Sequence, residues 1–393
     1  MRVESATTYV VGNPPPYHGG RYFVFVKLTT DDGIDGIGEV YAATFGPRSL
    51  ERMIEEVVER HVLGAHPFHV EALWRDVYGR GYGGRPDISL QSVLSGIEMA
   101  CWDIVGKAVE KPVYELLGGR VHERLRAYTY LYRVEGDEAD VYVDPDVAAR
   151  RAVEYVDLGF TAVKFDPADH YATLDPRQPS LPELDRLERY VARVRDAVGD
   201  RADLLLGTHG QFTTSGAKRV AARLERYDPL WFEEPTPPEA PEQMAAVARA
   251  TSIPIATGER LTTKHEFARV LAAGAASILQ MNLGRVGGLL EAKKIAGMAE
   301  AHYAQIAPHL YSGPVVGAAN IQLAACSPNF LLLEGIERWD GFHAEILRTP
   351  IRWEDGYVVP PSEPGLGVEL DEEVALAHPY EDEALHIEPD YVA

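Results

Sequence analysis

The chain has 393 residues, of which 46% are hydrophobic and 25% charged, so it is long enough for two packed domains and leaves little room for disorder. Asp and Glu total 60 against 38 Lys and Arg, a net charge of −22. That charge would repel nucleic acid phosphates and anionic membranes, and no apolar run is long enough for a membrane span. The sequence therefore excludes nucleic acid and membrane as partners.

The N-terminal segment carries no long apolar core of the kind found in signal peptides, so a cytoplasmic location is expected. The two cysteines, Cys101 and Cys326, each lie in an apolar stretch. We expect them to be buried thiols rather than a disulfide or a metal cluster.

Residues 1–124 are predicted to form an α+β capping domain. Tyr22–Leu28 and Ile37–Val40 have the alternating pattern of strands in a meander. The stretches Leu50–Gly64 and Leu90–Val109 are helical in pattern.

Residues 125–350 are predicted to form a (β/α) barrel of the TIM type, an α/β fold. Short β-rich runs alternate with amphipathic helical stretches, which is typical of parallel strands joined by helices. From Gly207 to Glu334 the ends of successive runs lie 23–27 residues apart, enough for one strand and one helix. Eight such runs close a barrel. They are Arg126–Leu131, Ala162–Phe165, Leu204–Gly207, Leu230–Glu233, Ile255–Glu259, Ile278–Asn282, Gln305–His309 and Phe330–Glu334.

Polar residues stand where these apolar runs stop. They are Lys164, His209, Glu233, Glu259, Asn282, His309 and Glu334. In such barrels the carboxyl ends of the strands meet on one face, where active sites lie. We therefore expect these side chains to converge. Pro167–Pro182 is predicted to be a long loop on the same face, and residues 351–393, which include the Pro- and Gly-rich Asp355–Leu370, are expected to pack back on the capping domain.

Three motifs resemble the mandelate racemase branch of the enolase superfamily, and the resemblance extends over essentially the whole chain. They are Ile97–Gly118 at the link from cap to barrel, and Phe232–Pro235 (FEEP) and Thr257–Arg260 (TGER) at strand ends. The resemblance implies that two loops of the cap, here Asn13–Gly20 and Tyr78–Arg85, close over the barrel mouth. The substrate contacts expected in these loops are Tyr17, His18, Tyr82 and Arg85.

The resemblance also implies metal-dependent removal of a proton beside a substrate carboxylate. Glu233 and Glu259 would bind Mg²⁺, which would hold the carboxylate and stabilise an enediolate. His309 would remove the alpha proton, and His209 would protonate the departing hydroxyl. Glu334 would hydrogen-bond a substrate carboxylate oxygen.

Three positions depart from the family pattern. Gly207 replaces the first metal-binding aspartate, so His209 becomes a candidate metal ligand, and Mn²⁺ or another divalent ion becomes an alternative to Mg²⁺. Asn282 replaces the aspartate that orients the seventh-strand histidine. The lysine pair that marks racemases reads Lys164-Phe165-Asp166, so Lys164 is expected to be a fixed positive charge near the carboxylate. Asp166 and Asn282 are further substrate-binding candidates.

These residues favour a hydro-lyase that dehydrates an acid sugar, an aldonate, to a 2-keto-3-deoxy acid. An epimerase or cycloisomerase of a sugar acid or lactone would use the same scaffold, and the altered positions keep it open. A third hypothesis is an acid-sugar-binding homologue with low activity, because both aspartates are absent. The expected partner is a small-molecule carboxylate, and the resemblance implies a homo-oligomer between dimer and octamer.

Overall fold

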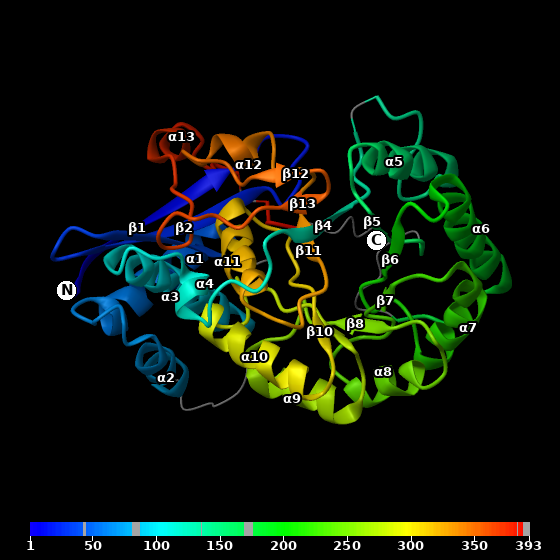
Figure 1. Ribbon diagram of the computed structural model, residues 1–393, viewed down its shortest axis with the longest axis horizontal. Helices are drawn as coiled ribbons and strands as arrows, with labels where there is room; N and C mark the ends of the chain where they lie inside the picture. Colours follow the sequence, from blue (N-terminus) through cyan, green and yellow to red (C-terminus); the bar gives the residue numbers. More distant parts are fainter. Residues whose placement is uncertain (42–44, 81–86, 135, 169–175, 383, 388–393) are drawn as a thin grey trace.

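The computed structural model describes residues 1–41, 45–80, 87–134, 136–168, 176–382 and 384–387. A barrel of parallel strands stands beside a three-stranded sheet with its own helices, as Figure 1 shows. This is the predicted α/β barrel with an N-terminal α+β cap. In the described part of the chain, no helix is both long and apolar enough to cross a membrane.

The cap is built on an antiparallel meander, in which β2 pairs with both β1 and β3. Its first strand, β1, was not predicted. Alternate side chains of β2 enter two different cores: Tyr22 and Val24 pack in the cap, whereas Phe23 and Phe25 pack with the barrel. The elements of the cap are β1 (Val3–Gly12), β2 (Tyr22–Thr30), β3 (Asp35–Val40), α1 (Pro47–Val57), a π-helical turn (Val58–Val62), α2 (Val70–Arg80), α3 (Ile88–Ala108) and α4 (Val113–Leu116).

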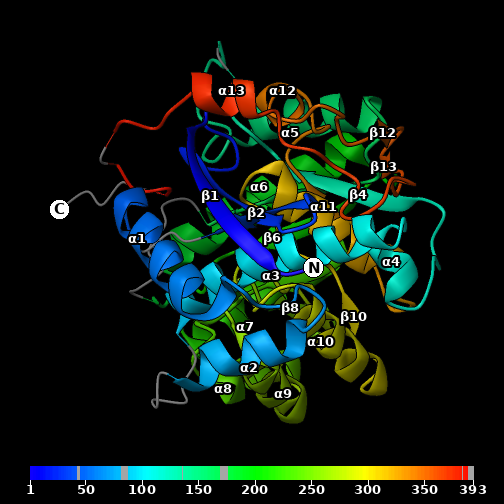
Figure 2. The same ribbon diagram turned by 90° about the vertical axis from the view of Figure 1, so that its left-hand side faces the viewer.

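Helix α3 is buried between the cap sheet and the barrel, and Figure 2 shows the cap in front of the barrel on this side. Its N-terminus is capped by Asp87, whose side chain accepts from the backbone N–H groups of Ser89 and Leu90. A Cβ at Gly38 would lie 1.8 Å from the carbonyl oxygen of Gly96. Glycine is therefore required here because strand β3 and helix α3 touch backbone to backbone.

Each of the eight predicted barrel runs contains or overlaps a strand. Strands β4 to β10 pair in sequence order, and β11 returns to pair with β4 in parallel, while an Ile306–Phe330 bridge joins the last gap. The strands are β4 (Leu125–Tyr130), β5 (Ala162–Phe165), β6 (Asp203–Gly207), β7 (Trp231–Glu233), β8 (Ile255–Thr257), β9 (Ile278–Leu279), β10 (Gln305–Ile306) and β11 (Leu333–Gly335). The helices around them are α5 (Pro145–Asp157), α6 (Leu181–Val198), α7 (Thr214–Leu224) with a 3₁₀ turn (Glu225–Tyr227), α8 (Pro241–Ala248), α9 (Thr263–Ala273), α10 (Leu289–Ala301) and α11 (Pro314–Ala325).

One apolar layer fills the barrel interior, with one side chain from each strand or its immediate end. Its members are Tyr128, Ala162, Leu205, Trp231, Ala256, Ile278, Ala307 and Leu332. The rings of Tyr128 and Trp231 meet edge to face, with centroids 5.3 Å apart. This layer is the apolar floor of the barrel mouth.

The C-terminal tail connects the barrel to the cap. Strands β12 (Trp353–Glu354) and β13 (Tyr357–Val358) form a hairpin, and β13 pairs with β4. Helix α12 (Phe342–Glu345) precedes the hairpin, and α13 (Glu372–Ala377) lies further on. Beyond α13, a bridge between Val11 and Pro379 adds the tail to the cap sheet.

Two buried glutamates of the cap hold the N-termini of two barrel helices. Glu39 of β3 accepts hydrogen bonds from the backbone N–H groups of Gly313, Val315 and Val316 at the start of α11. Glu98 of α3 does the same for Leu289 and Leu290 at the start of α10. Helix N-termini attract negative charge, so these contacts fix the cap against the barrel mouth.

Replacement of Glu39 by Ala should lower the free energy of unfolding by about 3 kcal/mol, because it leaves buried N–H groups without an acceptor. Urea unfolding of both proteins measures this difference. Glu39→Gln keeps one acceptor oxygen and is the matched control, so it should cost less. An equal loss in the two variants would show that the hydrogen bonds are not what Glu39 contributes.

Candidate active site

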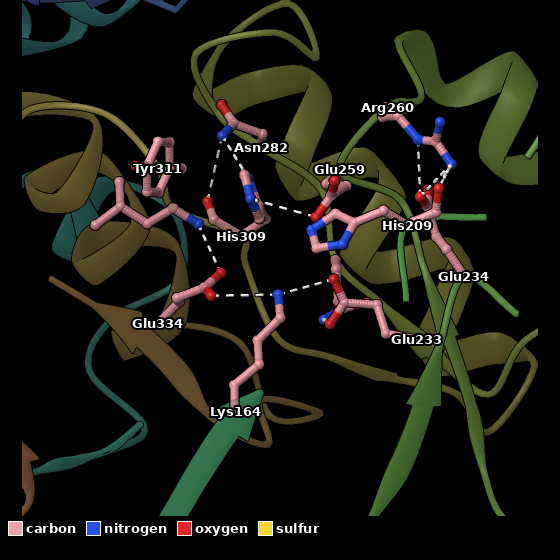
Figure 3. A network of polar contacts seen from close by, with 12 residues as sticks. Lys164, His209, Glu233, Glu234, Glu259, Arg260, Asn282, His309, Tyr311 and Glu334 are labelled. Carbon is pink, nitrogen blue, oxygen red and sulfur yellow. Dashed lines mark hydrogen bonds and ion pairs between the residues drawn. The ribbon is translucent and has the colours of Figure 1, made fainter. Parts of the chain in front are cut away.

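A polar layer lies directly above the apolar floor. Side chains alternate along a strand, so the residue two positions further along each strand faces the same interior. In chain order these residues are Tyr130, Lys164, Gly207, Glu233, Gly258, Gln280, His309 and Glu334. Gly258 has a positive φ of 143°, and the next residue, Glu259, supplies the carboxylate at that strand end. Figure 3 shows how the predicted residues among them converge, as the sequence predicted.

The centre of this layer is the ammonium group of Lys164, whose side chain is buried. Its Nζ donates to Oε1 of Glu233 at 2.8 Å and to Oε1 of Glu334 at 3.3 Å (Figure 3). Burial alone would lower the pKa of Lys164, but the nearby carboxylates of Glu233, Glu334 and Glu259 outweigh it and raise the pKa. Lys164 is therefore a buried positive charge, and its place beside the substrate carboxylate stays a prediction.

Both oxygens of Glu233 are engaged. Lys164 donates to Oε1, and Nε2 of Gln280 donates to Oε2 at 2.7 Å. Burial raises the pKa of Glu233 to about 8, although the ammonium of Lys164 opposes the shift. The hydrogen bonds donated to both oxygens favour the carboxylate form against this effect of burial. Gln280 was missed from sequence, although its position two residues after Ile278 was the available signal.

His309 is held by Asn282 and faces Glu259. Asn282 accepts the backbone N–H of Gly284 with Oδ1 at 2.9 Å, so its Nδ2 points at Nδ1 of His309, also at 2.9 Å. An amide nitrogen only donates, so Nδ1 must accept, and the neutral ring carries its proton on Nε2. That nitrogen lies 3.3 Å from Oε2 of Glu259.

The direction in which the pKa of His309 is shifted also indicates a neutral ring. Burial lowers the pKa of His309 more than Glu259 and Glu334 raise it. A neutral ring with Nε2–H is a hydrogen-bond donor, which opposes the role of base that the sequence predicted for His309.

His209 has a carboxylate at Nδ1, where His309 has an amide. Its Nδ1 lies 3.5 Å from Oδ2 of Asp166, and Asp166 is itself fixed by Nε2 of Gln211 at 2.6 Å and the backbone N–H of Ala168 at 2.8 Å. Burial opposes a charged His209, but Asp166 and Glu259 outweigh it and raise its pKa. The φ of His209 is +47°, a left-handed conformation that non-glycine residues rarely adopt outside constrained sites. Asp166 was predicted as a substrate contact, and the structure places it behind His209.

The second glutamate of FEEP and the arginine of TGER form a supporting pair that the sequence analysis did not assign. Nε of Arg260 donates to Oε2 of Glu234 at 2.8 Å, as Figure 3 shows, and its Nη2 donates to the carbonyl of His209 at 3.0 Å. This pair fixes the backbone that carries His209.

The cap contributes to the same face. The imidazole of His18 stacks on Tyr132, with centroids 4.2 Å apart, and its Nδ1 lies 3.8 Å from Oε2 of Glu337. Tyr17 is 39% exposed and lies against Arg21. The other two predicted loop contacts, Tyr82 and Arg85, lie outside the described residues.

A buried pair from the cap and barrel also went unpredicted. The guanidinium of Arg285 lies over the ring of Tyr41, 3.9 Å from its centroid, and Nη1 donates to the carbonyl of Glu259. Nε of Arg285 is buried and has no hydrogen-bond partner among the described residues. Arg285 is thus a second cation at the barrel mouth.

The residues present do not fit a divalent metal ion. No three His, Cys, Asp or Glu residues in the described ranges come together as metal ligands. Glu233 is occupied by Lys164 and Gln280, and Oε2 of Glu259 lies 3.3 Å from Nε2 of His309. Mg²⁺ prefers six oxygen ligands and disfavours imidazole, so Glu259 and His209 make a poor site.

Two family models match the chain. The one described as mandelate racemase / muconate lactonizing enzyme, N-terminal domain, matches residues 18–118, and the one described as enolase C-terminal domain-like matches residues 147–374.

Relatives match over nearly the full length. D-xylonate dehydratase of Haloferax volcanii is 35% identical, with 96% of this chain and 89% of the relative covered. D-galactonate dehydratase of Ralstonia nicotianae is 37% identical, with 96% and 94% covered. A crystal structure from Labrenzia alexandrii DFL-11, assigned to the mandelate racemase/muconate lactonizing enzymes, is 65% identical with a TM-score of 0.96, covering 99% of this chain and 98% of that chain.

The arrangement around His309 makes a prediction that needs no substrate. Histidine-selective ¹⁵N NMR should show the proton of His309 on Nε2. Replacement of Asn282 by Asp should move it to Nδ1 or charge the ring, because a carboxylate accepts where the amide donates. His309→Asn identifies the resonance. A proton on Nδ1 in the unaltered protein would contradict the hydrogen-bond assignment.

Proposed function

Since the chain belongs to the enolase superfamily, in its mandelate racemase and muconate lactonizing enzyme branch, we propose that it is a hydro-lyase that dehydrates an acid sugar. The observation that carries the proposal is the convergence of Lys164, His209 and His309 on one face of the barrel (Figure 3). The dehydratase names of relatives at about 36% identity support the same reaction class. Their substrates, D-galactonate and D-xylonate, are the first to test.

The reaction removes a hydrogen alpha to a carboxylate, which is far too weakly acidic for a side-chain base unless charge on the intermediate is stabilised. The ammonium of Lys164 has three N–H donors, and two meet Glu233 and Glu334. The third would bind the substrate carboxylate and the enediolate that develops from it. Arg285, in the segment that follows β9, adds a second positive charge.

Enzymes of the enolase superfamily generally use Mg²⁺. A bound metal ion there supplies Lewis-acid stabilisation of the enediolate. In this chain Glu233 is already engaged by Lys164 and Gln280, so the proposed steps are assigned to protein groups alone.

His209 is proposed as the proton carrier. A ring whose Nδ1–H faces a carboxylate can accept a proton at Nε2, and Asp166 stabilises the imidazolium that results. His209 would take the alpha proton from C2 and then give it to the hydroxyl on C3 as the C3–O bond breaks. Water leaves, and the enol becomes a 2-keto-3-deoxy acid, so no oxidant or further reactant is needed.

His309 is proposed as a neutral hydrogen-bond donor. Asn282 keeps its proton on Nε2, from which it would donate to a substrate oxygen without transferring the proton. Epimerisation needs a second base on the opposite face of the carbon. The tautomer of His309 does not provide one, which favours dehydration over that alternative.

Incubation with sugar acids, followed by semicarbazide detection of the keto product, tests the reaction class. His209→Asn should lower kcat by about 10³-fold, as expected for loss of a general base. His309→Asn should lower it by about 10²-fold, as expected for one lost donor. Asp166→Asn, which keeps the shape of the side chain, should reduce kcat with little change in KM.

Exchange of the alpha hydrogen in D₂O separates the two histidines. It should stop in His209→Asn and persist in His309→Asn. The opposite result would return the role of base to His309. Tight binding of sugar acids with neither hydrogen exchange nor keto product would instead support the hypothesis of an acid-sugar-binding homologue without activity.

A further inference from the structure

The backbone of Gly207 does not require glycine. Its φ is not in the left-handed region, so an L side chain would be compatible with the chain's conformation there. What requires glycine is space. A Cβ at this position would lie 2.7 Å from Cε of Lys164, closer than real Cβ contacts come. Any side chain at 207, including aspartate, would collide with the lysine as it lies.

Lys164 extends through the space that a residue at 207 would otherwise fill. Its Cγ and Cδ lie 3.7 and 3.8 Å from the same Cβ position, so the length of the lysine passes over Gly207. The ammonium at its end then reaches Oε1 of Glu233 (Figure 3). The absence of a carboxylate at position 207 is therefore what leaves room for the ammonium of Lys164 to reach Glu233.

The carboxylates of this layer have taken up protein donors. Glu233 is bound by Lys164 and Gln280, and Oε2 of Glu334 accepts the backbone N–H of Leu310 at 2.9 Å while its Oε1 meets Lys164. A divalent ion that binds Glu233 would have to displace the ammonium of Lys164 from its oxygen, and the two positive charges would then lie close together. Displacing Lys164 from Glu233 would leave the buried ammonium with Glu334 alone and a second cation beside it, which is costly.

We infer that the ammonium of Lys164 takes the place of the divalent cation in this chain, that Gly207 is the residue that admits it, and that the site holds a substrate carboxylate without a metal ion. The inference deepens the proposed function and rests on it for the class of substrate. Metal binding is measured without turnover, so a result against this inference can be distinguished from a result against the proposed function.

The test is titration of Mn²⁺ into protein stripped with EDTA, with free Mn²⁺ followed by electron paramagnetic resonance. The unaltered protein should bind no stoichiometric Mn²⁺. The double variant Gly207→Asp with Lys164→Ala restores a third carboxylate and removes the ammonium, so it should bind one Mn²⁺ per chain. Adding Glu259→Gln to the double variant is the matched control, which should abolish the gained binding.

Stoichiometric Mn²⁺ binding by the unaltered protein, lost in Glu259→Gln, would overturn the inference. So would a double variant that keeps its circular dichroism spectrum and binds no Mn²⁺. If the double variant does not fold, the unaltered protein alone tests the inference. Its melting temperature should be the same in EDTA and in millimolar Mg²⁺. A rise with Mg²⁺ that Glu259→Gln removes would overturn the inference as well.

Discussion

A buried ammonium must be paired, and much of the barrel mouth follows from that constraint on Lys164. Glu233 and Glu334 lie on either side of it, Gly207 leaves room for its side chain, and Gln280 occupies the other oxygen of Glu233. Each of these residues lies at or next to the carboxyl end of a different strand. The barrel brings them to one layer because side chains alternate along parallel strands that stop on the same face.

The second feature of the site is that different groups lie at Nδ1 of the two histidines. His309 has an amide beside it, and His209 has a carboxylate. A carboxylate beside an imidazole stabilises the charged ring, whereas an amide that donates to Nδ1 holds the ring neutral. The family pattern places the carboxylate at the end of the sixth strand, beside the seventh-strand histidine, and in this chain Asp166 provides one at the second strand. We therefore propose His209, and not His309, as the basic histidine of this chain.

The sequence predicted the barrel well because strand ends recur on a regular spacing and polar residues mark them. Strand β1 was missed because Val3–Gly12 mixes polar and apolar residues, and one face of it is covered only when the tail returns. Gln280 and Arg285 were missed because a single polar residue near a strand end is a weak signal without its neighbours. The link between Lys164 and Gly207 was beyond sequence reasoning, since it depends on where one side chain passes in space.

The account depends on which cation meets the substrate carboxylate. Crystals grown with a sugar acid and Mn²⁺, measured for anomalous scattering from manganese, would show it directly. The account predicts the carboxylate within hydrogen-bond distance of Nζ of Lys164, with no anomalous peak between Glu233 and Glu259. A peak bonded to both carboxylates, with Lys164 turned away from Glu233, would contradict it.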